Sequence, residues 1–121
     1  MLHKVTTTIV TNGSGDATVY LGSKIRGYLV ALKYSPGTLD TGADLVITGE
    51  TSGVPILTKS NAGTSDVWYY PRALPNAIAD GAAGTIPHEF VALVNERIKV
   101  VMAQGGDTKT GTIEAICEVE T

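Results

Sequence analysis

Cysteine, histidine and charge are scarce in this 121-residue sequence, and each shortage excludes a class of protein. The chain has one cysteine and two histidines, so it cannot form an internal disulfide or a zinc site built from several thiolates. Charged residues make up 17% of the chain, below the usual share of about 25%. The nine basic residues are scattered along the sequence, so a groove that tracks nucleic-acid phosphates is not expected.

Long apolar runs are also missing. No stretch is long enough to cross a bilayer, and the first residues, MLHKVTTTIV, lack the apolar core of a signal peptide. We therefore expect no membrane partner, and we expect synthesis as a soluble product inside the cell. The weakly charged composition suggests that a partner covers part of the surface, and the sequence indicates no cofactor.

Short β-branched runs alternate with clusters of Gly, Asp, Asn and Pro along the whole chain. This pattern predicts a single all-β domain over residues 1–121, an antiparallel β-sandwich of the jelly-roll or Greek-key type with about eight strands. The predicted strands are residues 3–11, 17–21, 24–35, 44–50, 54–59, 66–71, 97–103 and 111–120.

The few residues that could bind a metal or act as nucleophiles show no useful spacing. In the last predicted strand, Cys117 lies on the same face as Ile113 and Ala115. This placement favours a small buried hydrophobic side chain over a reactive thiol. His3 and His88 are far apart in the sequence and have no ligand spacing with each other or with Cys117. We interpret both histidines as ordinary surface residues.

The stretch TLDTGADLVI at residues 38–47 contains Asp40-Thr41-Gly42, the sequence found around the catalytic carboxylate of retroviral-type aspartic proteases. Such an enzyme needs two carboxylates that share one proton, so a chain of this size would have to dimerise. The context does not fit, because Ser35-Pro36-Gly37 predicts a turn where the protease needs a buried strand. We interpret the motif as a turn and keep a dimeric protease using Asp40 as an alternative.

Two further stretches have a structural and a functional interpretation. Residues 13–15, Gly-Ser-Gly, lack the Lys and the helix of a phosphate-binding loop, so they are predicted to form a hairpin turn. Alternation places Trp68 and Tyr70 on one face of their strand and Tyr69 on the other. We interpret these aromatic residues as core and rim, and a carbohydrate-binding module that uses Trp68 and Tyr70 is a further alternative.

The segment at residues 72–88 is long, rich in small residues and almost uncharged. Loops of this length inside a domain are usually functional. Its apolar side chains must either fold over the end of their own domain or pack on another subunit, and we favour the second. The predicted contact residues are Tyr70, Arg72, Leu74, Ile78 and Ile86, and the first strand near His3 and Lys4 is a second candidate.

Three stretches, YSPGTLDTGADLVITGETSGVPIL, WYYPRAL and RIKVVMAQGGDTKTGTIE, resemble small proteins encoded among the head genes of tailed bacteriophages. The resemblance covers nearly the whole chain and implies a virion structural protein. The size further suggests a capsid decoration, or cement, protein that binds the major capsid protein and stabilises the head. On this resemblance the Asp-Thr-Gly run is a family turn, and no functional residues are carried over.

The resemblance also sets expectations for assembly and location. We expect a non-enzymatic homo-oligomer, with a trimer favoured, that is synthesised in the host cytoplasm and ends on the capsid surface of the virion. Many weak contacts repeated on a symmetric lattice would add up, so no single strong contact needs to stand out in the sequence. A head–tail connector or a tail component is the alternative within the same class.

Overall fold

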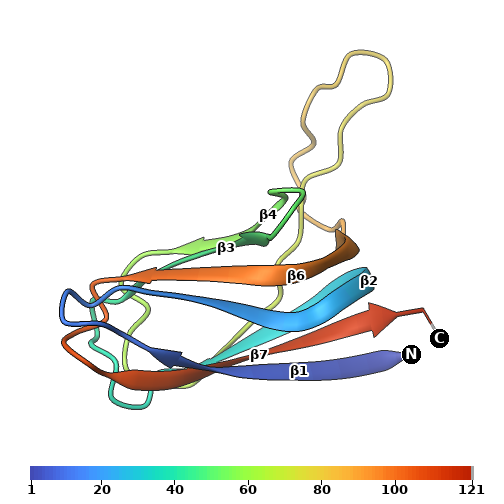
Figure 1. Ribbon diagram of the computed structural model, residues 1–121. Helices are drawn as coiled ribbons and strands as arrows, with labels where there is room; N and C mark the ends of the chain where they lie inside the picture. Colours follow the sequence, from blue (N-terminus) through green and yellow to red (C-terminus); the bar gives the residue numbers. More distant parts are fainter. Residues whose placement is uncertain (121) are drawn as a thin grey trace.

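The computed structural model describes residues 1–120, which contain seven β-strands and no helix (Figure 1). The strands are β1 (Leu2–Val10), β2 (Ala17–Ser35), β3 (Asp44–Gly49), β4 (Pro55–Lys59), β5 (Val67–Tyr69), β6 (Val91–Ala103) and β7 (Thr110–Val119). They form one antiparallel sheet in the order β1-β7-β2-β6-β3-β4, and β5 pairs with β2. The all-β, antiparallel prediction is therefore confirmed. Within the described residues, no helix has the length and apolar character needed to span a membrane.

The expected break between residues 17–21 and 24–35 is wrong, because these two predicted strands are one long strand, β2. Gly22 has a φ of 77°, and the pairing with β6 shifts between Leu21 and Ile25. A glycine with positive φ lets a strand absorb extra residues as a bulge without ending. β6 likewise begins at Val91 and not at residue 97, so it is longer than predicted.

Strand β2 connects the two parts of the sheet. Its first part pairs with β6, and its second part pairs with β7 and β5. Figure 1 shows β3, β4 and β6 at one level and β1 and β7 at another, with β2 between them. Gly27 lies where β2 pairs with both Leu93 of β6 and Val119 of β7. A Cβ at Gly27 would lie 1.9 Å from the Glu118 carbonyl oxygen, so no larger residue fits.

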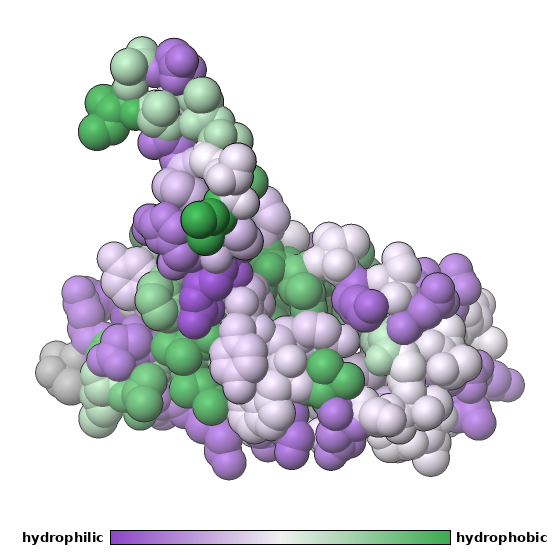
Figure 2. Space-filling model, turned by 180° about the vertical axis from the view of Figure 1, so that it is seen from behind, coloured by the Kyte–Doolittle hydropathy of each residue, from purple (hydrophilic) through white to green (hydrophobic). Residues whose placement is uncertain are grey.

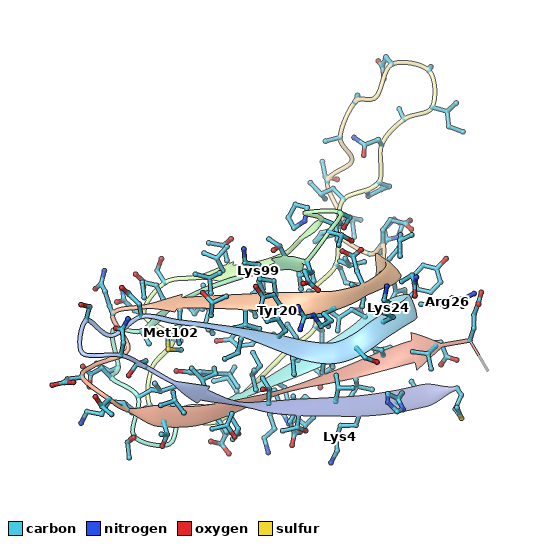
Figure 3. The ribbon with its side chains drawn as sticks, viewed as in Figure 1. Lys4, Tyr20, Lys24, Arg26, Lys99 and Met102 are labelled. Atoms are coloured by element: carbon cyan, nitrogen blue, oxygen red, sulfur yellow. The ribbon has the colours of Figure 1, made fainter. Side chains whose placement is uncertain are left out.

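The core lies between these levels and follows from alternation along the strands. In β7, Ile113, Ala115 and Cys117 are all buried, as their spacing predicts. Met102 of β6 points to the interior (Figure 3) and is 1% exposed. The largest fully buried side chains are Tyr34, Ile9, Leu21, Leu29, Leu32, Leu39, Leu45, Ile47, Ile98, Met102, Ile113 and Val100.

One buried carboxylate ties the β3–β4 turn to β6. Glu96 is 2% exposed, and its Oε1 accepts hydrogen bonds from the backbone N–H groups of Thr51 and Ser52, each at 3.0 Å. Its Oε2 accepts one from the Val94 N–H at 3.2 Å. Burial alone would raise the pKa of Glu96, but these hydrogen bonds outweigh it and lower the pKa to about 2.

Candidate interaction surface

Residues 71–90, which we call the arm, connect β5 to β6 and project from the sheet (Figure 1). The arm is shaped by its own backbone hydrogen bonds. Ala73 and Glu89 exchange two of them, at 2.7 and 3.0 Å, and the Gly84 N–H donates to the Pro75 carbonyl at 2.8 Å. At the tip, the side-chain amide of Asn76 donates to the Gly81 carbonyl at 2.9 Å. Beyond its base, the arm therefore has a defined shape that its own hydrogen bonds set.

The prolines of the arm explain why it is not a regular hairpin. Three of the five prolines of the chain, Pro71, Pro75 and Pro87, lie in it. A proline has no N–H and cannot donate to a strand ladder. Only two isolated bridges form as a result, Ala73 with Glu89 and Asn76 with Ala83.

The apolar side chains of the arm are exposed to solvent. Ile78 is 105% exposed, Ile86 is 70% exposed and Leu74 is 43% exposed. Pro71 is the only buried residue of the arm. Figure 2 shows the arm standing away from the body, with apolar side chains along it and further apolar surface on the body beneath its base. The segment thus does not fold over the end of its own domain.

Contacts at the base fix where the arm leaves the sheet. The Arg72 guanidinium donates from Nη1 to the carbonyl oxygens of Val30 at 3.0 Å and Pro71 at 2.8 Å. Its Cζ also lies 4.0 Å from the centre of the Phe90 ring, a cation–π contact. Arg72 therefore holds the base of the arm in place, and its contact with a partner stays a prediction.

The exposed apolar surface continues from the arm onto the sheet. Tyr28 and Phe90 meet edge to face, with 6.5 Å between the ring centres, and they line a hollow of about 410 Å³. Tyr28 also lines an adjoining hollow with Val94, which is 71% exposed. Sequence reasoning missed these three residues, because Tyr28 lies in an apolar run that predicts a core strand.

The predicted aromatic alternation is confirmed. Trp68 and Tyr70 are 44% and 63% exposed, whereas Tyr69 packs against the core. The Lys33 ammonium lies 5.7 Å from the centre of the Trp68 ring. Tyr70 directly precedes the arm. Four of the five predicted contact residues are exposed, and the exception is Arg72, which is half-buried.

The Asp40-Thr41-Gly42 stretch is a turn, as predicted, and lies at the end of the sheet opposite the arm. The Asp40 N–H donates to the Gly105 carbonyl at 3.0 Å, and the Asp40 carbonyl accepts from the Ala43 N–H at 3.1 Å. Asp40 and Asp107 line the same shallow hollow. No hydrogen bond between their carboxylates exists in the described residues. The motif therefore has a structural explanation in its backbone.

The second predicted contact region lies on β1, where register pairs His3 with Cys117 of β7. Cys117 is 1% exposed, and burial raises the pKa of its thiol to about 11. A thiol with a raised pKa is protonated near neutral pH and is a poor nucleophile. Across residues 1–120, no three His, Cys, Asp or Glu side chains gather as metal ligands.

No protein-family model matches the chain, and no curated protein matches its sequence. The arm and the surface at its base carry large apolar side chains that remain exposed after the chain has folded.

Proposed function

We propose that this chain is a non-enzymatic structural protein of a tailed-bacteriophage virion, a capsid decoration protein that binds the major capsid protein and stabilises the head. The single observation that carries the proposal is the arm, which holds Ile78 and Ile86 away from the sheet and in solvent. Exposed apolar patches of this kind mark surfaces that are covered by another molecule.

The shape of the arm suits insertion between neighbouring subunits of a shell. Its backbone hydrogen bonds set its form before binding, so less conformational entropy is lost when it docks. Its side chains are mainly small or apolar. Its ionisable residues are Arg72, Asp80, His88 and Glu89. Contact would therefore rest on apolar burial and close packing, not on charge.

Repetition on a lattice completes the proposal. We propose a homo-oligomer, with a trimer favoured by the resemblance, whose copies each bring an arm to the capsid surface after synthesis in the host cytoplasm. Several weak contacts held together then bind far more tightly than one. We further propose that the bent sheet is a two-layer sandwich of jelly-roll or Greek-key type, with β1 and β7 facing β3, β4 and β6.

The test is addition of the purified protein to phage shells that lack it. We expect stoichiometric binding and a higher melting temperature of the shell, because each bound copy stabilises the assembled state. Ile78→Glu and Leu74→Glu should reduce occupancy by roughly tenfold or more, since each places a charge in an apolar contact.

Val46→Glu is the matched control. Val46 lies on β3 and is 43% exposed, the same fraction as Leu74, so the substitution makes the same chemical change outside the arm. It should leave occupancy unchanged. Shells that take up no protein would overturn the proposal, as would arm variants that bind like the wild type. Binding to isolated connectors or tails, with none to shells, would favour the alternative placement.

A further inference from the structure

Strand β1 is the one long edge of the sheet without protection. The opposite edge, β4, has five residues, begins with Pro55 and ends with Lys59. β1 has nine residues, no proline and one charged side chain, Lys4. Its pairing with β7 runs without a bulge from Leu2 to Val10. Sheet edges are usually blunted by charge, proline or bulges, because an open edge pairs with other strands.

The backbone of β1 presents a row of unpaired groups to solvent. The Met1 N-terminal ammonium donates to the Val119 carbonyl at 2.9 Å, and the Val119 N–H donates back to the Met1 carbonyl at 2.9 Å. At the other end of the strand, the Thr11 N–H donates to the Lys109 carbonyl at 3.0 Å. Because hydrogen bonding alternates along an antiparallel pair, the odd-numbered residues of β1 bond to β7 and the even-numbered ones point away from it. The even-numbered residues are Leu2, Lys4, Thr6, Thr8 and Val10. All five are exposed, and within residues 1–120 β1 pairs with β7 alone.

We infer that two copies of this chain associate by pairing their β1 edges in antiparallel fashion about a two-fold axis at Thr6. In this register every outward-pointing residue faces another outward-pointing residue. The facing pairs are Leu2 with the partner's Val10, Lys4 with the partner's Thr8, and Thr6 with the partner's Thr6. Each such pair exchanges two backbone hydrogen bonds, which makes about ten across the strand.

The side chains favour this register over the others. Leu2 and Val10 are 63% and 54% exposed, and the pairing sets them side by side so that each covers the other. The two Lys4 side chains stay roughly 14 Å apart along the strands, four residues at strand spacing. A register centred on Lys4 would place like charges directly opposite each other and leave Val10 without a partner.

The inference uses no residue of the arm and would stand if the proposed capsid role failed. A trimer of the kind proposed above would have to form through a surface other than the β1 edge. β1 forms one edge of the sheet, whereas the arm leaves from the connection of β5 to β6. Pairing of the β1 edges therefore leaves both arms of a dimer available. A single pair of strands is smaller than a standard interface of about 1,600 Å², so we expect a weak dimer whose population depends on protein concentration.

Thr6 provides a charge test, because it faces its own copy at the two-fold axis. We expect the wild-type protein to show a reversible monomer–dimer equilibrium by sedimentation velocity. Thr6→Lys and Thr6→Glu should each weaken dimerisation roughly tenfold or more, since like charges then oppose each other. A one-to-one mixture of the two variants should restore the dimer, because Lys then faces Glu.

Thr58→Lys and Thr58→Glu are the matched controls, since Thr58 is an exposed threonine on the other edge strand, β4. They should dimerise like the wild type, and circular dichroism with thermal melting confirms that every variant is folded. A wild-type protein that stays monomeric at all accessible concentrations would overturn the inference. So would oligomers, trimers included, that are indifferent to charge at Thr6, or a mixture that fails to restore pairing.

Thr6→Pro tests the backbone contribution separately. The Thr6 N–H points away from β7, so its loss leaves the ladder between β1 and β7 intact while removing hydrogen bonds at the dimer axis. We expect a folded monomer. A Thr6→Pro protein that dimerises with wild-type strength would show that the copies meet elsewhere.

Discussion

Strand β3 and the arm contain the same apolar residue types but differ in where those side chains lie. In β3, Leu45 and Ile47 are 0% and 1% exposed, whereas Ile78 and Ile86 of the arm are 105% and 70% exposed. β3 pairs with β4 on one side and β6 on the other. Within residues 1–120, the arm pairs with no strand and forms two isolated bridges, both between its own residues.

The difference shows that pairing with neighbouring strands decides whether apolar side chains reach the core. Once both neighbours satisfy the backbone of a strand, alternate residues must point to opposite faces, and one face meets the core. The prolines of the arm prevent this regular pairing. Its apolar residues therefore contribute little to folding and remain available to a partner. Substitutions in the body and in the arm should have separable effects on stability and on binding.

The largest effect is expected at Gly27, where β2 passes from β6 to β7. Gly27→Ala would bring a Cβ to within 1.9 Å of the Glu118 carbonyl oxygen, which is backbone and cannot turn aside. We expect destabilisation of more than about 4 kcal/mol, in the range reserved for severe steric conflicts. Urea unfolding, or failure to obtain folded protein, would measure it.

Gly53→Ala is the control for this substitution. Gly53 also has a positive φ, 72°, but among the described residues no atom other than those of Gly53 and its two chain neighbours lies within 4 Å of the added Cβ. It should cost only about 1 kcal/mol, the strain of a non-glycine residue in a left-handed conformation. Equal losses at the two glycines would show that the close approach to Glu118 is not what restricts Gly27.

The next effect is expected at Glu96, which is buried and accepts hydrogen bonds from the β3–β4 turn. Glu96→Ala removes the acceptor and leaves the N–H groups of Thr51 and Ser52 without partners. The expected destabilisation is about 1.5–3 kcal/mol, the range for hydrogen bonds to a charged group, and denaturant unfolding at pH 7 measures it. Thr64→Ala, at an exposed loop position, should stay within about 0.5 kcal/mol of the wild type.

The lowered pKa of Glu96 also predicts a pH dependence. Because its folded pKa is about 2 and the pKa of an unfolded Glu is near 4.3, its contribution is fully present above about pH 5. It is lost progressively as the pH falls towards 2. Glu96→Gln should lack this part of the acid-induced loss of unfolding free energy. A Gln variant with an unchanged acid profile would assign the loss to other carboxylates.

The smallest effect on stability is expected in the arm. Ile78→Glu should change the free energy of unfolding by no more than about 0.5 kcal/mol, because the Ile78 side chain is in solvent before and after the change. Chemical denaturation measures this. A loss of 2 kcal/mol or more would mean that the arm packs on its own body in solution, and the contrast with β3 would disappear.

Much of the fold could be predicted from local patterns. The turns at residues 12–16 and 36–42 follow from Gly, Asn, Asp and Pro, and the inner face of β7 follows from the alternation of Ile113, Ala115 and Cys117. The length and composition of residues 72–88 distinguish this segment, which forms most of the arm, from the predicted strands. No local pattern predicts the apolar surface at its base, since Tyr28 and Phe90 are brought together by chain segments far apart in the sequence.

The sequence by itself determined most of the strands, the turns at residues 12–16 and 36–42, and the long apolar segment at residues 72–88, because these features depend on residues a few positions apart. Only the tertiary structure decided that β2 continues through Gly22, that β1 pairs with β7 and forms an edge, and that Arg72 braces the base of the arm. Strand neighbours and register arise from contacts between distant segments, and a local pattern of alternation is compatible with many such pairings.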